Sequence, residues 1–200
     1  MRNALGLLPC PDSSVASVAQ VDAASPRRAE AEAFIAGVFA RRYGARVTSF
    51  APNLLLIEQR GRVVAATGWR GAGAEPLFLE RYLDEPVERA VSRLAARRVA
   101  RTRIAEVGNL AAEGNGGSLR VIGALAGRLA ALGHEWVVFT ATQELIGIFT
   151  RLGLPLLALA KADPARLGAA AESWGSYYDT APVVVAGRIR VALERLGRAA

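Results

Sequence analysis

Residues Arg103–Leu154 decide the fold, and they read RIAEVGNLAAEGNGGSLRVIGALAGRLAALGHEWVVFTATQELIGIFTRLGL. A strand-like run over Arg103–Leu110 meets a glycine-rich loop at residues 113–117, and Ser118 then opens an amphipathic helix. A second strand follows over Trp136–Thr140, and a short helix comes after it. This alternation of strand and helix predicts part of an α/β sheet.

The junction between the first strand and its helix is a suitable place for a phosphate group. Glycines let the backbone approach a ligand closely, and the first-turn N–H groups of a helix have no internal partners. The helix dipole also favours an anion at this end. The alternative is a flexible turn in which Ser118 only caps the helix. We expect a phosphate-bearing acyl donor to contact Gly114, Asn115, Gly116, Gly117, Ser118 and Arg120.

Composition describes a globular, basic chain. It has 200 residues, of which 52% are hydrophobic, and a net charge of +7 that comes almost wholly from arginine, since Lys161 is the only lysine. A solvated basic face is the first interpretation of this charge, and a phosphate-rich cofactor or an acidic carrier protein is the second. Nucleic acid ranks low because no nucleic-acid-binding signature is present.

Cysteine and histidine usage limits the chemistry. Cys10 is the only cysteine and His134 the only histidine, so no intrachain disulfide is possible and we expect no metal site. The apolar run Ala4–Leu8 is too short for a signal peptide, and no apolar stretch approaches the ~20 residues of a membrane helix. We therefore expect a cytoplasmic protein and consider a membrane partner unlikely.

The remaining elements complete one mixed α/β sheet (α+β in the broader sense) with helices on both faces. Residues 1–25 form a loose segment with a possible edge strand at 14–23, and residues 26–200 form a single domain. The pattern predicts helices over Arg27–Tyr43, from Pro86 to about Arg98, from Pro164 and over Arg188–Arg198, and further strands over Leu54–Glu58, Val63–Trp69, Leu156–Ala160 and Val183–Ala186.

This order of elements resembles the GNAT acyltransferase fold. In that superfamily a central strand leads into a loop that holds the cofactor pyrophosphate, and the next strand splays away to admit the pantetheine arm. A short helix then ends in a pattern that resembles Ile148–Leu154, IFTRLGL. Two positions depart from the pattern: the loop reads EGNGGSLR, and Phe149 stands where a tyrosine general acid is common.

A second resemblance covers nearly the whole chain. Its blocks are LFLERYLDEPVE (77–88), IAEVGNLA (104–111), WVVFTAT (136–142), RLGL (151–154) and WGSYYD-x-x-P-V (174–183), and they resemble the bacterial thermostable hemolysin family. The family name implies a pore-forming toxin. The residues favour the acyltransferase instead, because the sequence has no membrane helix and no long amphipathic hairpin.

Three side chains are candidates for catalysis. Glu106 could be a general base with a pKa raised by partial burial, or it could form an ion pair with an arginine. The sequence favours neither interpretation over the other. Tyr177 could replace the general acid missing at Phe149, although packing at the sheet edge is the more common role of such aromatic residues. Glu80 could contact a polar substrate or lie in a solvated loop.

Backbone and hydroxyl groups are the remaining cofactor candidates. The backbone of Val107, Gly108, Asn109 and Leu110 could hold the thioester and pantetheine, while Thr140 and Thr142 could bind the cofactor or cap the next helix. The sequence thus predicts transfer of an acyl group from acyl-CoA or an acyl-phosphopantetheine carrier protein to a small amine acceptor. The alternatives are a membrane-active hemolysin and a catalytically silent acyl-CoA-binding module.

Overall fold

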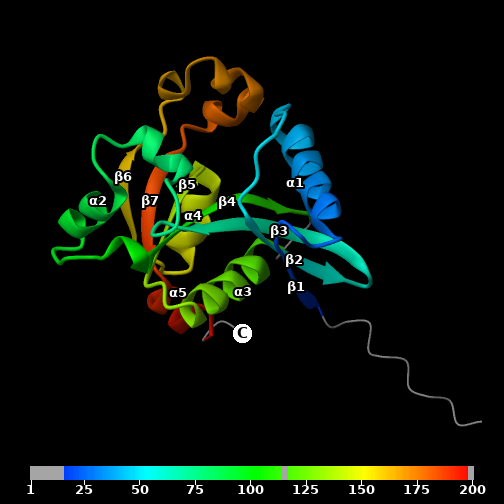
Figure 1. Ribbon diagram of the computed structural model, residues 1–200, viewed down its shortest axis with the longest axis horizontal. Helices are drawn as coiled ribbons and strands as arrows, with labels where there is room; N and C mark the ends of the chain where they lie inside the picture. The colour runs from blue at the N-terminus through cyan, green and yellow to red at the C-terminus, as the bar shows by residue number, and fades with distance from the viewer. Residues whose placement is uncertain (1–15, 114–116, 198–200) are drawn as a thin grey trace, which may run out of the picture.

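The computed structural model describes residues 16–113 and 117–197, which are built around one seven-stranded sheet (Figure 1). The strand order is β1-β2-β3-β4-β5-β7-β6. All neighbours are antiparallel except the central pair, β4 and β5, which run parallel. The strands are β1 (Ser17–Val21), β2 (Asn53–Gln59), β3 (Arg62–Gly71), β4 (Ile104–Ala112), β5 (Trp136–Ala141), β6 (Leu156–Lys161) and β7 (Val183–Arg188).

Helices cover both faces of this sheet, so the predicted mixed α/β architecture is confirmed. The α-helices are α1 (Arg28–Tyr43), α2 (Val87–Leu94), α3 (Gly117–Ala131), α4 (Gln143–Arg151) and α5 (Ile189–Leu196). More tightly wound 3-10 segments are η1 (Phe78–Tyr82), η2 (Arg101–Arg103) and η3 (Pro164–Thr180). In Figure 1, α3 and α5 lie side by side, and η3 lies next to the C-terminal end of α1.

The strand period of two decides which helices meet which face. Along β2, Leu54 and Leu56 pack with α1, whereas Leu55 and Ile57 pack with α3. Leucine and isoleucine therefore occupy both faces of this interior strand, as expected when a sheet is covered on two sides. One layer holds α1, η1, α2 and η3, and the other holds α3, α4 and α5.

The structure corrects the length of one predicted helix. The helix that follows Pro86 ends at Leu94 and does not reach Arg98. Ala96 adopts a positive φ of 51°, which breaks the helical path, and the Ser92 hydroxyl accepts a hydrogen bond from the Val99 backbone at 2.9 Å. Val99 is thereby returned to the core, where it is 4% exposed. Burial of Val99 is a tertiary effect that the local pattern does not contain.

The aromatic segment Trp174–Asp179 near the C-terminus reads WGSYYD, a pattern that predicts turns, but it is helical in the structure. It lies in η3, which begins after Asp163, whose carboxylate accepts a hydrogen bond from the Ala165 backbone at 2.9 Å. Gly168 and Gly175 interrupt η3 with φ values of 57° and 52°. A Cβ at position 175 would lie 2.0 Å from the Tyr43 carbonyl oxygen, so only glycine lets η3 approach α1 this closely. Within the described part of the chain, none of the helices has both the length and the apolar character needed to cross a membrane.

Candidate functional site

The two parallel strands at the centre of the sheet separate after their fourth pair of residues. Pairing between β4 and β5 runs from Ile104↔Trp136 to Val107↔Phe139 and, within residues 16–113 and 117–197, goes no further. Each strand keeps its outer neighbour beyond that point, because β4 stays paired with β3 and β5 with β7. A gap therefore opens between the carboxyl ends of β4 and β5, where open sheets commonly bind ligands.

A β-bulge in β4 accompanies the separation. Asn109 has a φ of 53°, a left-handed conformation that is unusual for a residue other than glycine. Its side chain accepts a hydrogen bond from the Ala51 backbone at 3.1 Å. On the neighbouring strand, the Thr67 hydroxyl donates to the Gly108 carbonyl oxygen at 3.1 Å. These side-chain bonds hold the irregular backbone in place, as bulges beside active sites require.

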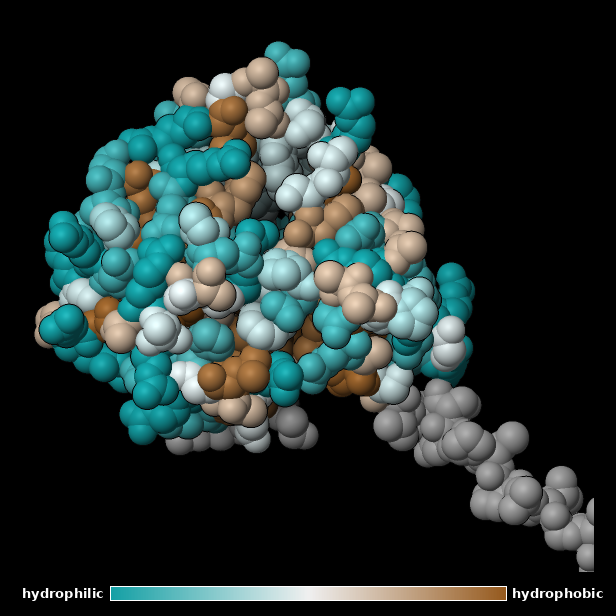
Figure 2. Space-filling model, in the orientation of Figure 1, coloured by the Kyte–Doolittle hydropathy of each residue, from teal (hydrophilic) through white to brown (hydrophobic). Residues whose placement is uncertain are grey.

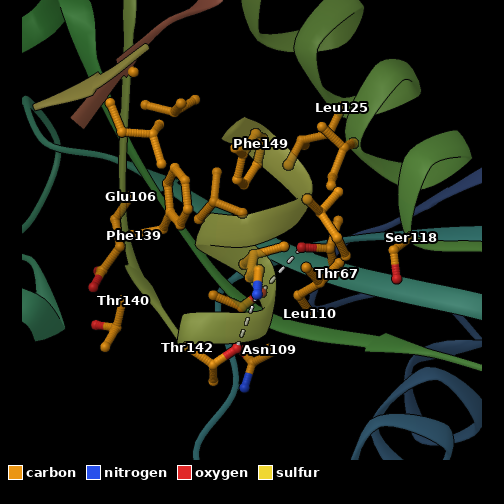
Figure 3. Close-up of a pocket in the computed structure, with 18 of the residues that line it drawn as sticks. Thr67, Glu106, Asn109, Leu110, Ser118, Leu125, Phe139, Thr140, Thr142 and Phe149 are labelled. Carbon is orange, nitrogen blue, oxygen red and sulfur yellow. Dashed lines mark hydrogen bonds between the residues drawn. The ribbon is translucent and has the colours of Figure 1, made fainter. Parts of the chain in front are cut away.

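A cavity of about 260 Å³ occupies the gap, and residues from both faces of the sheet line it (Figure 3). One end is apolar and lies under α3, α4 and α5. Figure 3 shows Leu125 and Phe149 approaching this end from α3 and α4, while Glu106 and Thr140 lie at the other side of Phe139. The apolar lining includes Leu110, Ile122, Leu125, Ala126, Leu129, Phe139, Phe149, Ile189 and Ala192.

The other end of the cavity is aromatic and partly polar. Its rings are Phe39, Tyr43, Phe78, Tyr82, Trp174, Tyr177 and Tyr178. The Tyr82 and Tyr178 hydroxyls share a 2.6 Å hydrogen bond, and the Tyr177 hydroxyl donates to the Thr140 carbonyl oxygen at 3.4 Å. Burial raises the pKa of Tyr177 well above its ordinary value, so this phenol keeps its proton at neutral pH. In Figure 2 the molecular surface is hollowed beneath η3, on a face that is mostly hydrophilic.

Glu106 is the buried carboxylate of the cavity, and it is 7% exposed. Its two oxygens accept hydrogen bonds from the backbone of Phe78, at 2.9 Å, and Leu79, at 2.8 Å, while the Arg70 Nε lies 3.3 Å from Oε2. Burial is the main influence and raises the pKa of Glu106, against the opposing effect of these donors. The carboxylate therefore anchors η1 to β4 beside Arg70, as the ion-pair interpretation predicted, and it also lines the cavity.

Glu80 lies outside the cavity, so we withdraw a catalytic role for it. Its carboxylate is held by the Arg101 guanidinium at 2.6 and 2.8 Å and by the Leu77 and Val87 backbone N–H groups at 3.0 and 3.1 Å. The Arg101 bonds above all lower the pKa of Glu80 to about 2, which makes it a very weak base. With four donors on its two oxygens, Glu80 fastens η1 to α2 and to the β3–β4 connection.

The predicted cofactor residues fall into three groups. Seven line the cavity: Val107, Gly108, Asn109, Leu110, Ser118, Thr140 and Thr142. Three, Gly114, Asn115 and Gly116, lie outside the described residues, and Gly117 begins α3. Arg120 does not line the cavity and donates to the Gln59 side chain at 3.3 Å. Thr142 also caps α4 by accepting from the Leu145 backbone at 3.3 Å, as its alternative role predicted.

Phe149 and His134 both have structural surroundings. Phe149 packs on Phe139 with ring centroids 5.3 Å apart in an apolar cluster, where a tyrosine hydroxyl would need a buried partner. His134 packs edge-on against Trp69, away from the cavity lining, and burial lowers its pKa. Across the part of the chain that the structure describes, no three His, Cys, Asp or Glu side chains gather to form a metal-binding group.

Several cavity residues escaped sequence analysis. Tyr43, Thr67 and Arg70 lie in a predicted helix and hairpin far from the glycine loop, and their own pattern gives no functional signal. Trp174 and Tyr178 were recognised only as part of an aromatic turn. One signal could have identified Arg70 and Thr67: each is a polar side chain in a strand whose other residues are largely apolar.

Comparison with known proteins gives one family and a shared fold. A family model described as thermostable hemolysin matches residues 21–193. The structure resembles the AHL synthase LasI, with a TM-score of 0.58, 15% identity, and coverage of 90% of this chain and 93% of that one. The CoA-dependent acyl-homoserine lactone synthase BjaI, solved with SAM and isopentyl-CoA, has a TM-score of 0.60 and 16% identity, with coverage of 91% of this chain and 88% of that one. FeeM, an N-acyl amino acid synthase from uncultured soil microbes, has a TM-score of 0.59 and 11% identity, with coverage of 90% of this chain and 94% of that one.

A search of curated proteins found no match. At these identities the likeness to solved structures establishes the fold alone, which this chain shares with the three synthases.

Proposed function

We propose that this chain, which belongs to the thermostable hemolysin family, transfers an acyl group from a thioester donor to an amine or similar small nucleophile. The donor is acyl-CoA or an acyl-phosphopantetheine carrier protein. The observation that carries the proposal is the cavity in the gap between β4 and β5, with an apolar end and a polar aromatic end. A thioester has the same division, because its acyl chain is apolar and its reacting carbonyl is polar.

The donor would lie in the gap with its acyl chain at the apolar end of the cavity and its phosphate near α3. The acyl chain would occupy the apolar end, near Leu125 and Ile189, where burial of each CH₂ group contributes about 0.8 kcal/mol. The pantetheine amides would pair with β4 backbone beyond Val107, which has no neighbouring strand on the β5 side within the described residues. A phosphate would then lie near the N-terminal end of α3, which begins at Gly117.

The reaction needs a base for the amine and a proton for the departing thiol. Glu106, whose pKa is raised by burial, would take a proton from the acceptor's ammonium group, either directly or through water. The amine nitrogen then attacks the thioester carbon, the C–S bond breaks, and the second proton that the nitrogen loses passes to the departing sulfur, so that an amide and a thiol form. Tyr177 keeps its proton and, among the described residues, makes one long hydrogen bond, so its hydroxyl would donate a hydrogen bond to the departing sulfur and relay that proton to it.

The relatives of known structure lend support by what their names describe. LasI and BjaI are described as acyl-homoserine lactone synthases, and FeeM as an N-acyl amino acid synthase. Each name describes a product with an acyl group on a small molecule. BjaI was solved with isopentyl-CoA, a coenzyme A derivative with a short alkyl chain on its sulfur.

A lytic activity is the second candidate function, and the family description favours it. We infer that acyl transfer could account for it, because a long acyl chain on a polar amine makes a detergent-like product. Such a small molecule has no fold to lose on heating.

Solvent extract from a completed reaction and the purified protein should be added separately to red cells, each before and after boiling. Lysis by boiled extract but not by protein supports the product; lysis by protein alone supports a pore-forming toxin.

The test of acyl transfer is release of thiol coupled to formation of an amide. Purified protein should be mixed with decanoyl-CoA, or with a decanoyl carrier protein, and a panel of amines, with thiol release followed by colour and products by mass spectrometry. Tyr177→Phe keeps the ring and removes the hydroxyl, so turnover should fall by about 10²–10⁴ with donor binding retained. Donor binding with no turnover in the unaltered protein would identify the silent binding module and refute the enzyme.

A further inference from the structure

Arg70 faces the cavity with most of its hydrogen-bonding capacity unused. A guanidinium carries five N–H donors. Its side chain is 19% exposed, and among the described residues its one hydrogen bond is a long one, 3.4 Å from Nη1 to the Glu75 carboxylate. The Glu106 carboxylate lies 3.3 Å from Nε. Both distances exceed the 2.7–2.9 Å that is usual for a charge-assisted hydrogen bond.

Arg101 shows what a structural arginine in this protein looks like. Its guanidinium donates to the Ala72 carbonyl oxygen at 2.8 Å and makes three further bonds of 2.6–2.9 Å to the carboxylates of Glu80 and Glu88. Arg101 lies away from the cavity, whereas Arg70 is part of its lining. Of these two arginines, Arg70 is the one that a ligand in the cavity can reach; Arg188 also lines the cavity, but its guanidinium lies over the Trp136 ring, 5.6 Å from the ring centroid.

Arg70 and Glu106 present opposite charges side by side. They are register partners on β3 and β4, so the sheet fixes their spacing. The other charged pair on the cavity wall, Arg42 and Glu144, is already joined by a direct ion pair between α1 and α4. An acceptor with only a positive charge would meet Arg70, and an acceptor with only a negative charge would meet Glu106. A molecule that carries both charges satisfies both side chains.

We propose that the acyl acceptor is an α-amino acid, or a derivative that keeps its amino and carboxylate groups, bound as a zwitterion. Arg70 would bind the carboxylate through its free donors, since a guanidinium matches a carboxylate in geometry. Glu106 would face the ammonium group, and the rings of Trp174, Tyr177 and Tyr178 would enclose the side chain and attract the cation. This inference rests on the proposed acyl transfer and specifies its acceptor.

The test compares amino acids with matched amines that lack the carboxylate. Thiol release from decanoyl-CoA and from a decanoyl carrier protein should be measured with a panel of L-amino acids, their decarboxylated amines and their amides. L-Phenylalanine, phenylethylamine and phenylalanine amide are one such set. We expect kcat/KM to be about 10- to 100-fold higher for the amino acid, from the usual strength of hydrogen bonds between charged groups.

Three variants separate binding from folding. Arg70→Met should raise KM for the amino acid by the same factor and leave the amine's kcat/KM unchanged or higher, and Arg70→Lys should restore part of the difference. Arg93→Met is the control, because Arg93 is exposed and, among residues 16–113 and 117–197, its side chain pairs only with Glu85 on the surface. Equal rates with amino acids and amines would overturn the zwitterion inference and leave acyl transfer standing. No thiol release from either donor with any acceptor would overturn both.

Discussion

Replacing Glu106 by glutamine should destabilise the protein as well as slow the reaction. Both carboxylate oxygens accept backbone hydrogen bonds, from Phe78 at 2.9 Å and Leu79 at 2.8 Å. Glutamine offers one carbonyl oxygen and one NH₂ group, so one of the two N–H groups would face another donor. A buried N–H group without an acceptor costs about 1–3 kcal/mol, and the bond that remains loses the strength that the charge gives it.

An opposing effect reduces this loss. Burial raises the pKa of Glu106, which means that the ionised carboxylate is itself destabilised in the folded protein, and a neutral amide escapes that penalty. We therefore expect a net loss of about 2 kcal/mol in the free energy of unfolding. Glu106→Gln is therefore expected to change stability even though it preserves the shape of the side chain.

Urea denaturation measures this loss, with Glu135→Gln as a matched control. Glu135 is 44% exposed and pairs with Arg97 on the surface, so its replacement should cost less than about 1 kcal/mol. The Glu106→Gln midpoint should fall while the slope m stays constant. Rates should then be compared at a temperature where both variants are folded. If Glu106→Gln unfolds at the midpoint of the unaltered protein, the two backbone bonds do not anchor η1, and the reasoning fails.

Three further predictions concern Glu80, Ala126 and Asn109. Because the folded-state pKa of Glu80 is about 2 and the ordinary value is 4.5, its bonds to Arg101 stabilise the fold fully above about pH 4.5 and are lost as the pH falls towards 2. Glu80→Gln should accordingly flatten acid unfolding over that interval in circular dichroism, and an unchanged curve would show that other groups govern it. Ala126→Phe should fill the apolar end of the cavity and shift the preferred donor to shorter acyl-CoAs in a chain-length series; an unaltered preference would place the chain elsewhere. Asn109→Ala should cost about 1–3 kcal/mol in thermal unfolding, because the buried Ala51 N–H loses its acceptor, and full stability in that variant would contradict this role for the bulge.

Local patterns predicted much of the fold because hydrophobic periodicity marks its helices and strands, and glycine and proline mark their ends. The hairpin around Gly61, the strands β4 and β5, and the helices that follow them all carry the expected signals. The end of α2 was wrong, since burial of Val99 redirects the chain there. Neither period nor turn residues could give the strand order, in which β7 lies between β5 and β6.

The site was harder to predict because it is assembled from distant segments. The local strand–loop–helix motif predicted the ends of the two strands and Ser118 as ligand-binding residues, and in the structure these residues line one wall of the cavity. The second half of that wall comes from α1, β3 and η3, which have no motif in common. Glu106 shows the limit most clearly: alternation predicted its face, but its backbone donors in η1 depend on how residues 78–79 pack across the sheet.

A structure of the protein with a non-reactive thioether analogue of decanoyl-CoA tests the central claim most directly. We expect the sulfur to lie in the gap that opens between β4 and β5 beyond the Val107–Phe139 pair, with the acyl chain reaching Leu125 on α3. The cavity end lined by Tyr177 and Glu106 should then remain open for the acceptor. An analogue bound elsewhere, or an acyl chain among the aromatic rings of η3, would contradict the account.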